Sequence, residues 1–320
     1  MQSVKSVVRF TGAVLGSVAI LSGSALGAAA PPPLVWVAKP NALTPYRAPN
    51  KVRITLAEVQ AKHRGQASWT EVVGRDNELL LQYIQMAPGA KAGPTMLADQ
   101  RLSIIVWEGQ IRVSIEGQAP FVASKGFMIQ IPFRVPYTLE TVGTTPSLRF
   151  ETVSVTSLSR IYPASQTPPP PPAGYSWYKA AVPGRDTYER LNDRVYIDFF
   201  KEAAAAANAT GPQRLAPNGV FIKDGRNYAN IIRGPGIARQ PDTMRGHFHA
   251  NLGEFWFLME GQTSFLIEGV PYFVANPGDI VYAPAGRFHR ASPAGEGMAT
   301  RIAILGYYNN AHFFEPGGGD

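Results

Sequence analysis

Glu108–Pro132 reads EGQIRVSIEGQAPFVASKGFMIQIP, and Glu260–Pro284, which begins 152 residues later, reads EGQTSFLIEGVPYFVANPGDIVYAP. Eleven of the 25 aligned positions are identical without a gap, which marks an internal repeat. In both copies, short segments that alternate between apolar and polar residues flank a Glu-Gly turn, a pattern typical of β-strands joined by hairpins. The sequence therefore predicts two copies of one all-β unit.

Composition agrees with this fold class. The chain has 320 residues, long enough for two domains, and contains 31 glycines and 28 prolines. This content is above average and indicates many turns and short strands rather than a helical bundle. The chain has no cysteine, which excludes disulfides, thiol nucleophiles, cysteine-ligated zinc and iron–sulfur clusters.

The amino-terminal segment resembles an export signal. Lys5 and Arg9 precede an uncharged, largely apolar stretch over residues 10–30, which ends in small residues. We predict a cleaved signal peptide at residues 1–29 and a secreted or periplasmic protein without stable membrane insertion; a membrane anchor is the alternative. Loss of Lys5 and Arg9 lowers the net charge from +7 to +5 (28 basic minus 23 acidic residues). The remaining basic residues are scattered, so nucleic acid is not an expected partner.

A proline-rich break divides the rest of the chain. Pro168–Pro172 are five consecutive prolines, and we expect them to form a stiff polyproline spacer. Asp186–Ala207 shows apolar residues at three- and four-residue spacing, which predicts a helix. We therefore place an amino-terminal domain at residues 30–160, a linker with a helix at 161–216, and a carboxyl-terminal domain at 217–320.

The second copy carries residues with metal-binding chemistry. Three imidazoles and a carboxylate suit a divalent first-row transition metal. Two of the imidazoles are one residue apart, so on a strand they point to the same face. The four residues are His247, His249, Glu254 and His289. The other two histidines, His63 and His312, lie outside this pattern and are expected at the surface or in hydrogen bonds.

The spacing resembles the two sequence motifs of the cupin superfamily. It runs His247-x-His249, four residues, Glu254, six residues, Gly261, and then Gly278, five residues, Pro284-Ala-Gly286, two residues, His289. The sequence departs from the family pattern at Pro241, where a glycine is usual, and at Pro293, where an asparagine often ends the second motif. Neither position is a ligand.

The resemblance implies an all-β fold of two double-stranded β-helix (jelly-roll) barrels. It implies that His247, His249, Glu254 and His289 converge on one divalent transition metal, with manganese, iron, nickel, copper and zinc all open. In the first copy the ligand positions are occupied by Thr95, Leu97, Leu102 and Tyr137. That barrel is therefore expected to be metal-free and to have a structural role. Because cupins often assemble, a homodimer is also open.

Strand parity nominates three further site residues in the second copy. Arg245 is expected on the inward face, where it binds a substrate anion and takes part in catalysis; a salt bridge at the barrel rim is the alternative. Tyr282 is a candidate catalytic hydroxyl. Trp256 is expected either to bind substrate or to pack in the core. Phe248 has the opposite parity and is expected to pack outward.

These features favour a metal-dependent enzyme that acts on a small oxygen-rich organic molecule, as a dioxygenase or a decarboxylase. Oxalate decarboxylases are two-barrel cupins with the same ligand set, but they place an arginine three residues before the first histidine of the pair, whereas Arg245 stands two before His247. A non-catalytic cupin that binds a small molecule or a metal is the main alternative. A structural module of the cell envelope is a third.

Overall fold

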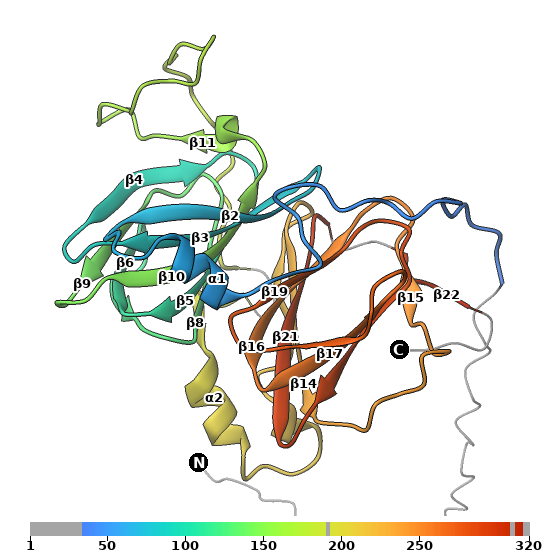
Figure 1. Cartoon of the computed structure of the whole chain (residues 1–320). Coiled ribbons are helices and arrows are strands. Elements are labelled where there is room, and N and C mark those ends of the chain that lie inside the picture. The colour runs from blue at the N-terminus through green and yellow to red at the C-terminus, as the bar shows by residue number, and fades with distance from the viewer. Residues whose placement is uncertain (1–33, 190–192, 308–310, 316–320) are drawn as a thin grey trace, which may run out of the picture. The chain divides into compact units, whose positions relative to one another are not determined.

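The fold is built from antiparallel strands that pair into four sheets. The structure is a computed structural model, and it describes residues 34–189, 193–307 and 311–315. The unit that begins at Val37 contains all of the described strands. Most of these strands gather into two groups, blue to green and yellow-orange to red in Figure 1. The predicted all-β fold with two double-stranded barrels is confirmed.

The first barrel consists of two facing sheets. The six strands of one sheet are, in spatial order, β12 (Tyr196–Asp198), β8 (Phe127–Ile131), β5 (Leu102–Glu108), β10 (Ser147–Ser154), β3 (Leu79–Met86) and β2 (Trp69–Arg75). The five strands of the other are β11 (Arg160–Ile161), β4 (Lys91–Leu97), β9 (Tyr137–Val142), β6 (Gln110–Ile115) and β7 (Phe121–Ala123). The short helix α1 (Leu56–Lys62) precedes β2, and a 3₁₀ turn, η1 (Ser157–Ser159), precedes β11.

The second barrel repeats this arrangement. Its six-stranded sheet is ordered β1 (Arg53–Ile54), β19 (Ile280–Ala283), β16 (Glu254–Glu260), β21 (Met298–Leu305), β14 (Tyr228–Pro235) and β13 (Gly219–Lys223). Its five-stranded sheet is ordered β18 (Phe273–Ala275), β17 (Gln262–Ile267), β20 (His289–Ala294), β15 (His247–Phe248) and β22 (Phe313–Phe314). Helix α2 (Phe199–Ala206) and a 3₁₀ helix, η2 (Gly211–Leu215), connect the barrels.

Central strands of the two six-stranded sheets are buried on both faces. In β16, Trp256 and Leu258 face the interior of the second barrel, whereas Phe255 and Phe257 belong to a separate core shared with the first barrel. Successive side chains of a strand point to opposite faces, so a strand between two cores reads as a continuous apolar run. β5 follows the same rule in the first barrel.

The shared core joins the barrels directly. Phe257 of β16 meets three rings of the first barrel, those of Phe150, Trp107 and Tyr83, at centroid distances of 4.8, 5.3 and 6.5 Å. The buried Tyr83 hydroxyl donates a hydrogen bond to the carbonyl of Gly278, so a polar contact also crosses the interface. The apolar contact implies that the two barrels are stabilised together.

Two strands cross the domain boundaries that the sequence suggested. β1 lies within the range 30–160 assigned to the first domain, yet it pairs with β19 of the second barrel. β12 lies within the range 161–216 assigned to the linker, yet it pairs with β8 of the first barrel. Each barrel thus gains an edge strand from a segment outside its repeat, which covers backbone groups that would otherwise be unpaired.

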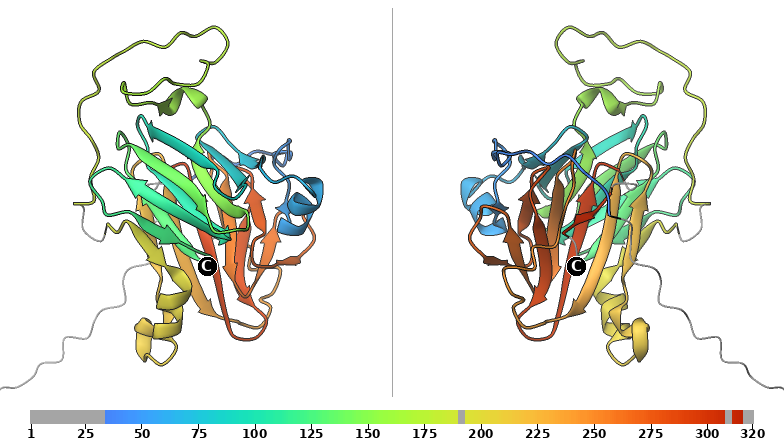
Figure 2. Two further views of the ribbon diagram at one scale, coloured as in Figure 1. Left: turned by 90° about the vertical axis from the view of Figure 1, so that its left-hand side faces the viewer. Right: turned by 90° about the vertical axis from the view of Figure 1, so that its right-hand side faces the viewer.

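The proline segment lies on a surface loop rather than between separated domains. The indole of Trp177 donates a hydrogen bond to the carbonyl of Pro169 at 2.6 Å and meets the Tyr162 ring edge-on. This loop extends beyond the sheets in both views of Figure 2. The barrels pack on each other through the core shared by their own sheets, and Pro168–Pro172 lie outside that core.

Over the described part of the predicted helix Asp186–Ala207, residues 186–189 and 193–207, the α-helix is α2 alone. Asp186 accepts hydrogen bonds from the buried Arg101 guanidinium, which holds this part of the chain against the first barrel. Residues 196–198 form β12 instead of a helical turn, and the Asp198 side chain caps the amino terminus of α2. Tertiary contacts therefore override the local periodicity over the first half of the predicted helix.

The predicted signal peptide at residues 1–29 lies outside the described residues. Among the helices that the structure does describe, none has the length and apolar character needed to cross a membrane.

Candidate metal centre

Three strand starts bring the predicted ligands together. His247 opens β15, Glu254 opens β16 and His289 opens β20, and His247 is paired directly with His289 across the sheet. His249 follows β15 and shares the face of His247. Phe248, between them, packs against the rings of Phe288 and Phe313, so its predicted outward orientation is what the structure shows.

Gly246 sets the start of β15. Its φ of +76° lies in the left-handed region that favours glycine. A Cβ at this position would overlap the carbonyl oxygen of His289 on the neighbouring strand. Close approach of the two strands places His247 and His289 on one side of the site, and only glycine permits it.

The four side chains converge on one point in the interior of the barrel. One carboxylate oxygen of Glu254, Oε2, lies 3.0 Å from Nε2 of His249, 3.2 Å from Nε2 of His289 and 3.7 Å from Nε2 of His247. All four ligand atoms lie within 4.8 Å of one another, and all four residues are buried. Among the described residues, this is the one group of three or more potential metal-ligating side chains at such distances.

Backbone carbonyls fix two of the imidazoles. Nδ1 of His249 lies 3.0 Å from the carbonyl oxygen of Ala311, and Nδ1 of His289 lies 3.0 Å from that of Arg287. A carbonyl only accepts, so each Nδ1 carries the proton and donates it. The Nε2 lone pairs then face the centre, which is how protein partners of metal-binding histidines orient them.

The electrostatics favour the ionisation states that bind a metal. Burial alone would raise the pKa of Glu254, but the imidazoles of His247, His249 and His289 that surround its carboxylate hold it well below its usual range. Burial lowers the pKa of His289, an effect that Glu254 partly offsets. The carboxylate is therefore ionised and His289 is biased toward its neutral form, as metal ligands must be.

The donor set fits a transition metal. Three imidazole nitrogens and one carboxylate oxygen, without sulfur, match manganese, iron, nickel, copper or zinc. Calcium and magnesium prefer all-oxygen sites, so the three imidazoles argue against them. The orientation of Nε2 on His249 and His289 toward a common point supports this fit independently of the motif. The geometry does not select one metal.

A cavity of about 210 Å³ adjoins the site. It is smaller than the roughly 300–1,000 Å³ of pockets for drug-sized ligands, which limits it to a small molecule. Besides His247, Glu254 and His289, its walls come from β14, β16, β20, β21 and the residue just before β22. These lining residues are Tyr228, Asn230, Ile232, Trp256, Ala291, Arg301, Ala303, Leu305 and His312.

One of the three additional predicted site residues lines this cavity. Trp256 forms part of the wall, with its ring centroid 5.2 Å from that of His289. Its neighbours Phe255 and Phe257 point to the other face of β16 and belong to the core shared by the barrels. The alternation expected from strand parity therefore holds at Trp256.

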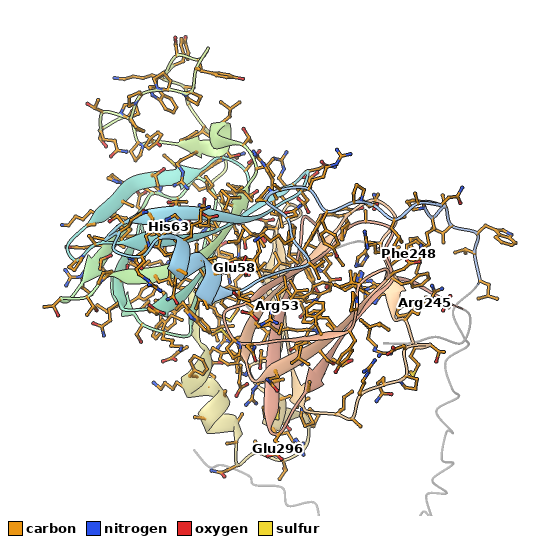
Figure 3. The ribbon with its side chains drawn as sticks, viewed as in Figure 1. Arg53, Glu58, His63, Arg245, Phe248 and Glu296 are labelled. Atoms are coloured by element: carbon orange, nitrogen blue, oxygen red, sulfur yellow. The ribbon has the colours of Figure 1, made fainter. Side chains whose placement is uncertain are left out.

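Arg245 lies elsewhere. It forms ion pairs with Glu315 and with Glu268, and its guanidinium lies 4.2 Å from the centre of the Phe288 ring. Figure 3 labels it beside β15, at the surface of the barrel. The prediction that Arg245 shares the inward face of His247 was wrong because Gly246, with its positive φ, interrupts the strand between them. The rim salt bridge considered as the alternative is the arrangement observed.

Tyr282 also lies away from the cavity. Its ring stacks on Phe255 with centroids 4.2 Å apart, on the side of the sheet that faces the shared core. The adjacent residues of β19, Val281 and Ala283, face the interior of the second barrel. Tyr282 is therefore on the side of β19 that faces the shared core and not on the side that faces the barrel interior. This placement does not support a catalytic hydroxyl at Tyr282.

Sequence reasoning missed the other residues of the cavity wall, among them His312 and Arg301. His312 was expected outside the site, but its ring lies 4.4 Å from that of His247 and 4.7 Å from that of His249, between centroids. Arg301 is 152 residues after Arg149, so the two arginines correspond under the offset of the repeat. Extending the comparison beyond Pro284 would have shown this correspondence. No comparable sequence signal pointed to His312, because the carboxyl-terminal strand that carries it lies outside the motifs.

The fifth histidine, His63, makes its contacts in the first barrel. His63 stacks on Trp69 and lies 2.9 Å from a carboxylate oxygen of Glu71.

Comparisons with known proteins give likenesses in structure only. No family model matches the chain, and no curated protein matches it. Among solved structures, a single-residue variant of oxalate decarboxylase from Bacillus subtilis is 12% identical over 83% of this chain and 79% of its own, with a TM-score of 0.47. A cupin 2 conserved barrel domain protein from Leptotrichia buccalis is 11% identical over 79% of this chain and 95% of its own, with a TM-score of 0.49. The chain is similar to these proteins, and at such identities and scores the likeness says nothing about a shared activity.

Proposed function

We propose that this protein is a metal-dependent enzyme that acts on a small organic acid in the second barrel. The observation that carries the proposal is the cavity of about 210 Å³, which has the ligands His247, Glu254 and His289 in its wall together with the guanidinium-bearing Arg301. A cation beside a metal site suits a molecule that combines a carboxylate with further oxygen donors. The small volume favours a substrate of few atoms.

The cavity residues can divide the work between binding and proton transfer. Arg301 would hold the carboxylate of the substrate, and Trp256 would pack against its carbon atoms and exclude water. Burial and the nearby Glu254 charge raise the pKa of Tyr228, so its hydroxyl stays protonated and can donate a hydrogen bond. His312 lies at the wall, where its imidazole can take part in proton transfer.

A transition metal bound by the four ligands would supply Lewis-acid and redox chemistry. We infer that the reaction is either a dioxygenation or a decarboxylation. Both classes use a substrate whose oxygen atoms face the metal, and both need the cavity wall to orient the bond that breaks. The four ligands do not distinguish these reactions, because the difference lies in the surrounding residues.

A non-catalytic binding protein is the second candidate, and one observation favours it. Besides the metal ligand Glu254, the described residues that line the cavity include no carboxylate. An acid or base for turnover would have to be Tyr228, His312 or a ligand itself. A protein that only stores or carries a small acid needs none of these.

The test combines turnover with a variant of the cavity. The protein would be reconstituted separately with each candidate metal and supplied with small hydroxy- and dicarboxylic acids, while oxygen uptake and carbon dioxide release are recorded. We expect turnover with at least one metal and a KM raised at least tenfold by Arg301→Gln. The exposed Arg239, changed to Gln, serves as the matched control. Binding of acids without turnover by any metal form would favour the second candidate.

We further propose that the protein is exported and loses residues 1–29. The support is the charge and apolar pattern of that segment in the sequence. Amino-terminal sequencing of the protein recovered from the periplasm would test this, and a start at residue 1 or 2 would contradict it. A homodimer stays a prediction, to be checked by light scattering of the purified protein.

A further inference from the structure

The internal repeat continues to the last strand of each barrel. In the first barrel, β11 pairs with β4 so that Ile161 lies opposite Met96. In the second barrel, β22 pairs with β15 so that Phe313 lies opposite Phe248. Both members of the second pair follow those of the first by 152 residues. By the same offset, Arg160 of the first barrel is the counterpart of His312.

The same correspondence places polar residues of the first barrel where the second barrel has its site. Tyr137 lies opposite Thr95, as His289 lies opposite His247. Gln82 lies opposite Glu151 on neighbouring strands, as Asn230 lies opposite Ala303. Where the second barrel has His289 and His247, the first barrel has a phenol and a hydroxyl, with an amide and a carboxylate on the facing sheet.

A cavity of about 350 Å³ lies at this place in the first barrel. Its polar lining comes from Arg75, Gln82, Thr156 and Arg160, and its apolar lining includes Leu80, Leu97 and Val153. Leu80, Gln82, Leu97 and Val153 stand at the positions of Tyr228, Asn230, His249 and Leu305 in the second barrel, by the pairing and offset given above. Three of these positions, those of Leu80, Gln82 and Val153, line the cavity in both barrels, as does the position shared by Arg160 and His312, so the two cavities overlap in their place in the barrel.

The charges around this cavity do not cancel. The buried Glu151 is already engaged, since Nε of Arg149 lies 2.6 Å from Oε1 and the amide of Gln82 donates to Oε2 at 3.2 Å. Arg160 donates to the hydroxyl of Tyr137 at 3.0 Å, and Arg75 donates to the carbonyl of Val155 at 2.9 Å. Both of those partners are neutral at pH 7.

Among the described residues, no carboxylate lies within 4.0 Å of the guanidinium of Arg75 or of Arg160. Arg160 is partly buried, so its charge is only partly screened by water. The Glu151 carboxylate offsets part of this charge without touching the guanidinium, so Arg160 keeps hydrogen-bond donors for an anionic ligand. The cavity next to Arg160 has room for such a ligand.

We propose that the first barrel binds a small organic carboxylate in this cavity, with Arg160 as its main anchor. The planar guanidinium holds a carboxylate through two parallel hydrogen bonds. Leu80, Leu97 and Val153 contact the apolar part of the ligand, which favours a carboxylic acid over inorganic phosphate. The site uses no metal and is independent of the function proposed for the second barrel.

The test measures binding to metal-free protein, so that turnover and metal content do not enter. The host is the full-length Arg301→Gln variant after treatment with EDTA, because it lacks the arginine of the second cavity. Titration calorimetry would use benzoate as the probe, benzamide as its neutral analogue, and inorganic phosphate. We expect benzoate to bind once per chain with a Kd on the order of 1 mM or tighter, and both other probes to bind at least tenfold more weakly.

Two substitutions assign the binding to Arg160. Arg160→Met should weaken benzoate binding at least tenfold, and Arg160→Lys, which keeps the charge but loses the planar fork, should give an intermediate affinity. Arg112→Gln, an exposed arginine on β6 of the same barrel, is the control and should bind benzoate as the host does. If Arg160→Met does not fold, the Arg160→Lys and Arg75→Gln variants decide, and both should bind more weakly.

Three results would overturn the proposal. These are the absence of benzoate binding to the folded host at 10 mM, equal binding of benzoate and benzamide, and unchanged affinity in the Arg160 variants. Tighter binding of phosphate than of benzoate would refute the organic carboxylate as the ligand. None of these results bears on the metal centre, so the two proposals fail separately.

Discussion

Nδ1 of His249 lies 3.0 Å from the carbonyl oxygen of Ala311, 62 residues later in the chain. The contact exists because β22, which begins two residues after Ala311, pairs with β15 next to the metal ligands. The carboxyl-terminal strand is therefore part of the metal centre, although it contributes none of the four ligands. It fixes the tautomer of His249 and places His312 at the cavity wall.

Removal of this strand should weaken metal binding. A chain that ends at residue 310 loses the carbonyl that orients His249, and loss of such a partner typically costs 10–100-fold in metal affinity. Competition titrations with zinc would measure the change. A chain that ends at Glu315, and so keeps β22, is the matched control and should bind as the full chain does. Equal affinity of the two truncated chains would contradict the role given to the strand.

Gly246→Ala should disrupt the centre more than a comparable change elsewhere. The new Cβ would be strained at φ +76° and would also overlap the carbonyl of His289, so we expect a loss of about 2–4 kcal/mol in stability together with loss of metal binding. Gly117 has a similar φ of +81°, but a Cβ there would meet no atom within 4 Å. Gly117→Ala is thus the control for strain alone, and a similar effect of both changes on metal binding would argue against the close approach of β15 and β20.

Phe257→Ala should destabilise both barrels at once. This ring contacts Phe150 and Trp107 across the interface, and truncation of a buried aromatic residue typically costs about 3–5 kcal/mol. Hydrogen exchange resolved by peptide should show faster exchange in strands of both barrels. Val122→Ala, at an exposed position of the first barrel, should leave exchange unchanged. Faster exchange confined to the second barrel would mean that the barrels unfold independently.

The segment around Lys39, which precedes β1, should contribute stability that depends on pH. Lys39 forms an ion pair with Glu268 at 2.8 Å. Burial would raise the pKa of Glu268, but the hydrogen bonds from Lys39 and from the backbone of Phe288 and the charges of Lys39 and Arg245 lower it below the usual 4.5. A lowered folded-state pKa means that this stability is present above about pH 4.5 and is lost as the pH falls through the folded-state value.

Glu268→Gln should therefore cost about 0.5–1 kcal/mol at pH 7 and progressively less as the pH falls below 4.5, because both partners are partly exposed. Thermal unfolding from pH 3 to pH 7 would measure the difference. Glu116→Gln, at the equivalent and more exposed position of the first barrel, is the control. A cost that stays constant over this pH range would show that the ionised form of Glu268 is not what matters.

The repeat predicted an all-β fold, and the resemblance of the motif spacing to cupins implied the barrels and the convergence of His247, His249, Glu254 and His289. A repeat with strand periodicity fixes which residues share a face, and the motif spacing reflects the strands that carry the ligands. The position predicted for Arg245 was wrong because the alternation of strand faces was assumed to continue through Gly246. The position predicted for Tyr282 was wrong because the opposite face of β19 was taken as the inward one. Parity holds only within an unbroken strand.

Other features depend on contacts between distant segments. β1 pairs with the second barrel and β12 pairs with the first. These strands have only two and three residues, so their sequences are too short to show the alternation that predicts a strand. His312 joins the cavity only because β22 returns to β15 after an interval outside the motifs. The Arg149 and Arg301 correspondence was available in the sequence, since the repeat extends further than its region of highest identity.

The most direct test of the metal centre is the metal content of the purified protein after reconstitution, measured by elemental mass spectrometry. We expect about one transition-metal ion per chain in the wild type and almost none when His247 and His289 are both changed to Ala. Arg239→Gln should retain the metal of the wild type. Absence of metal from the wild type with every candidate ion, or equal metal in the double variant, would contradict the assignment of His247, His249, Glu254 and His289 as a metal centre.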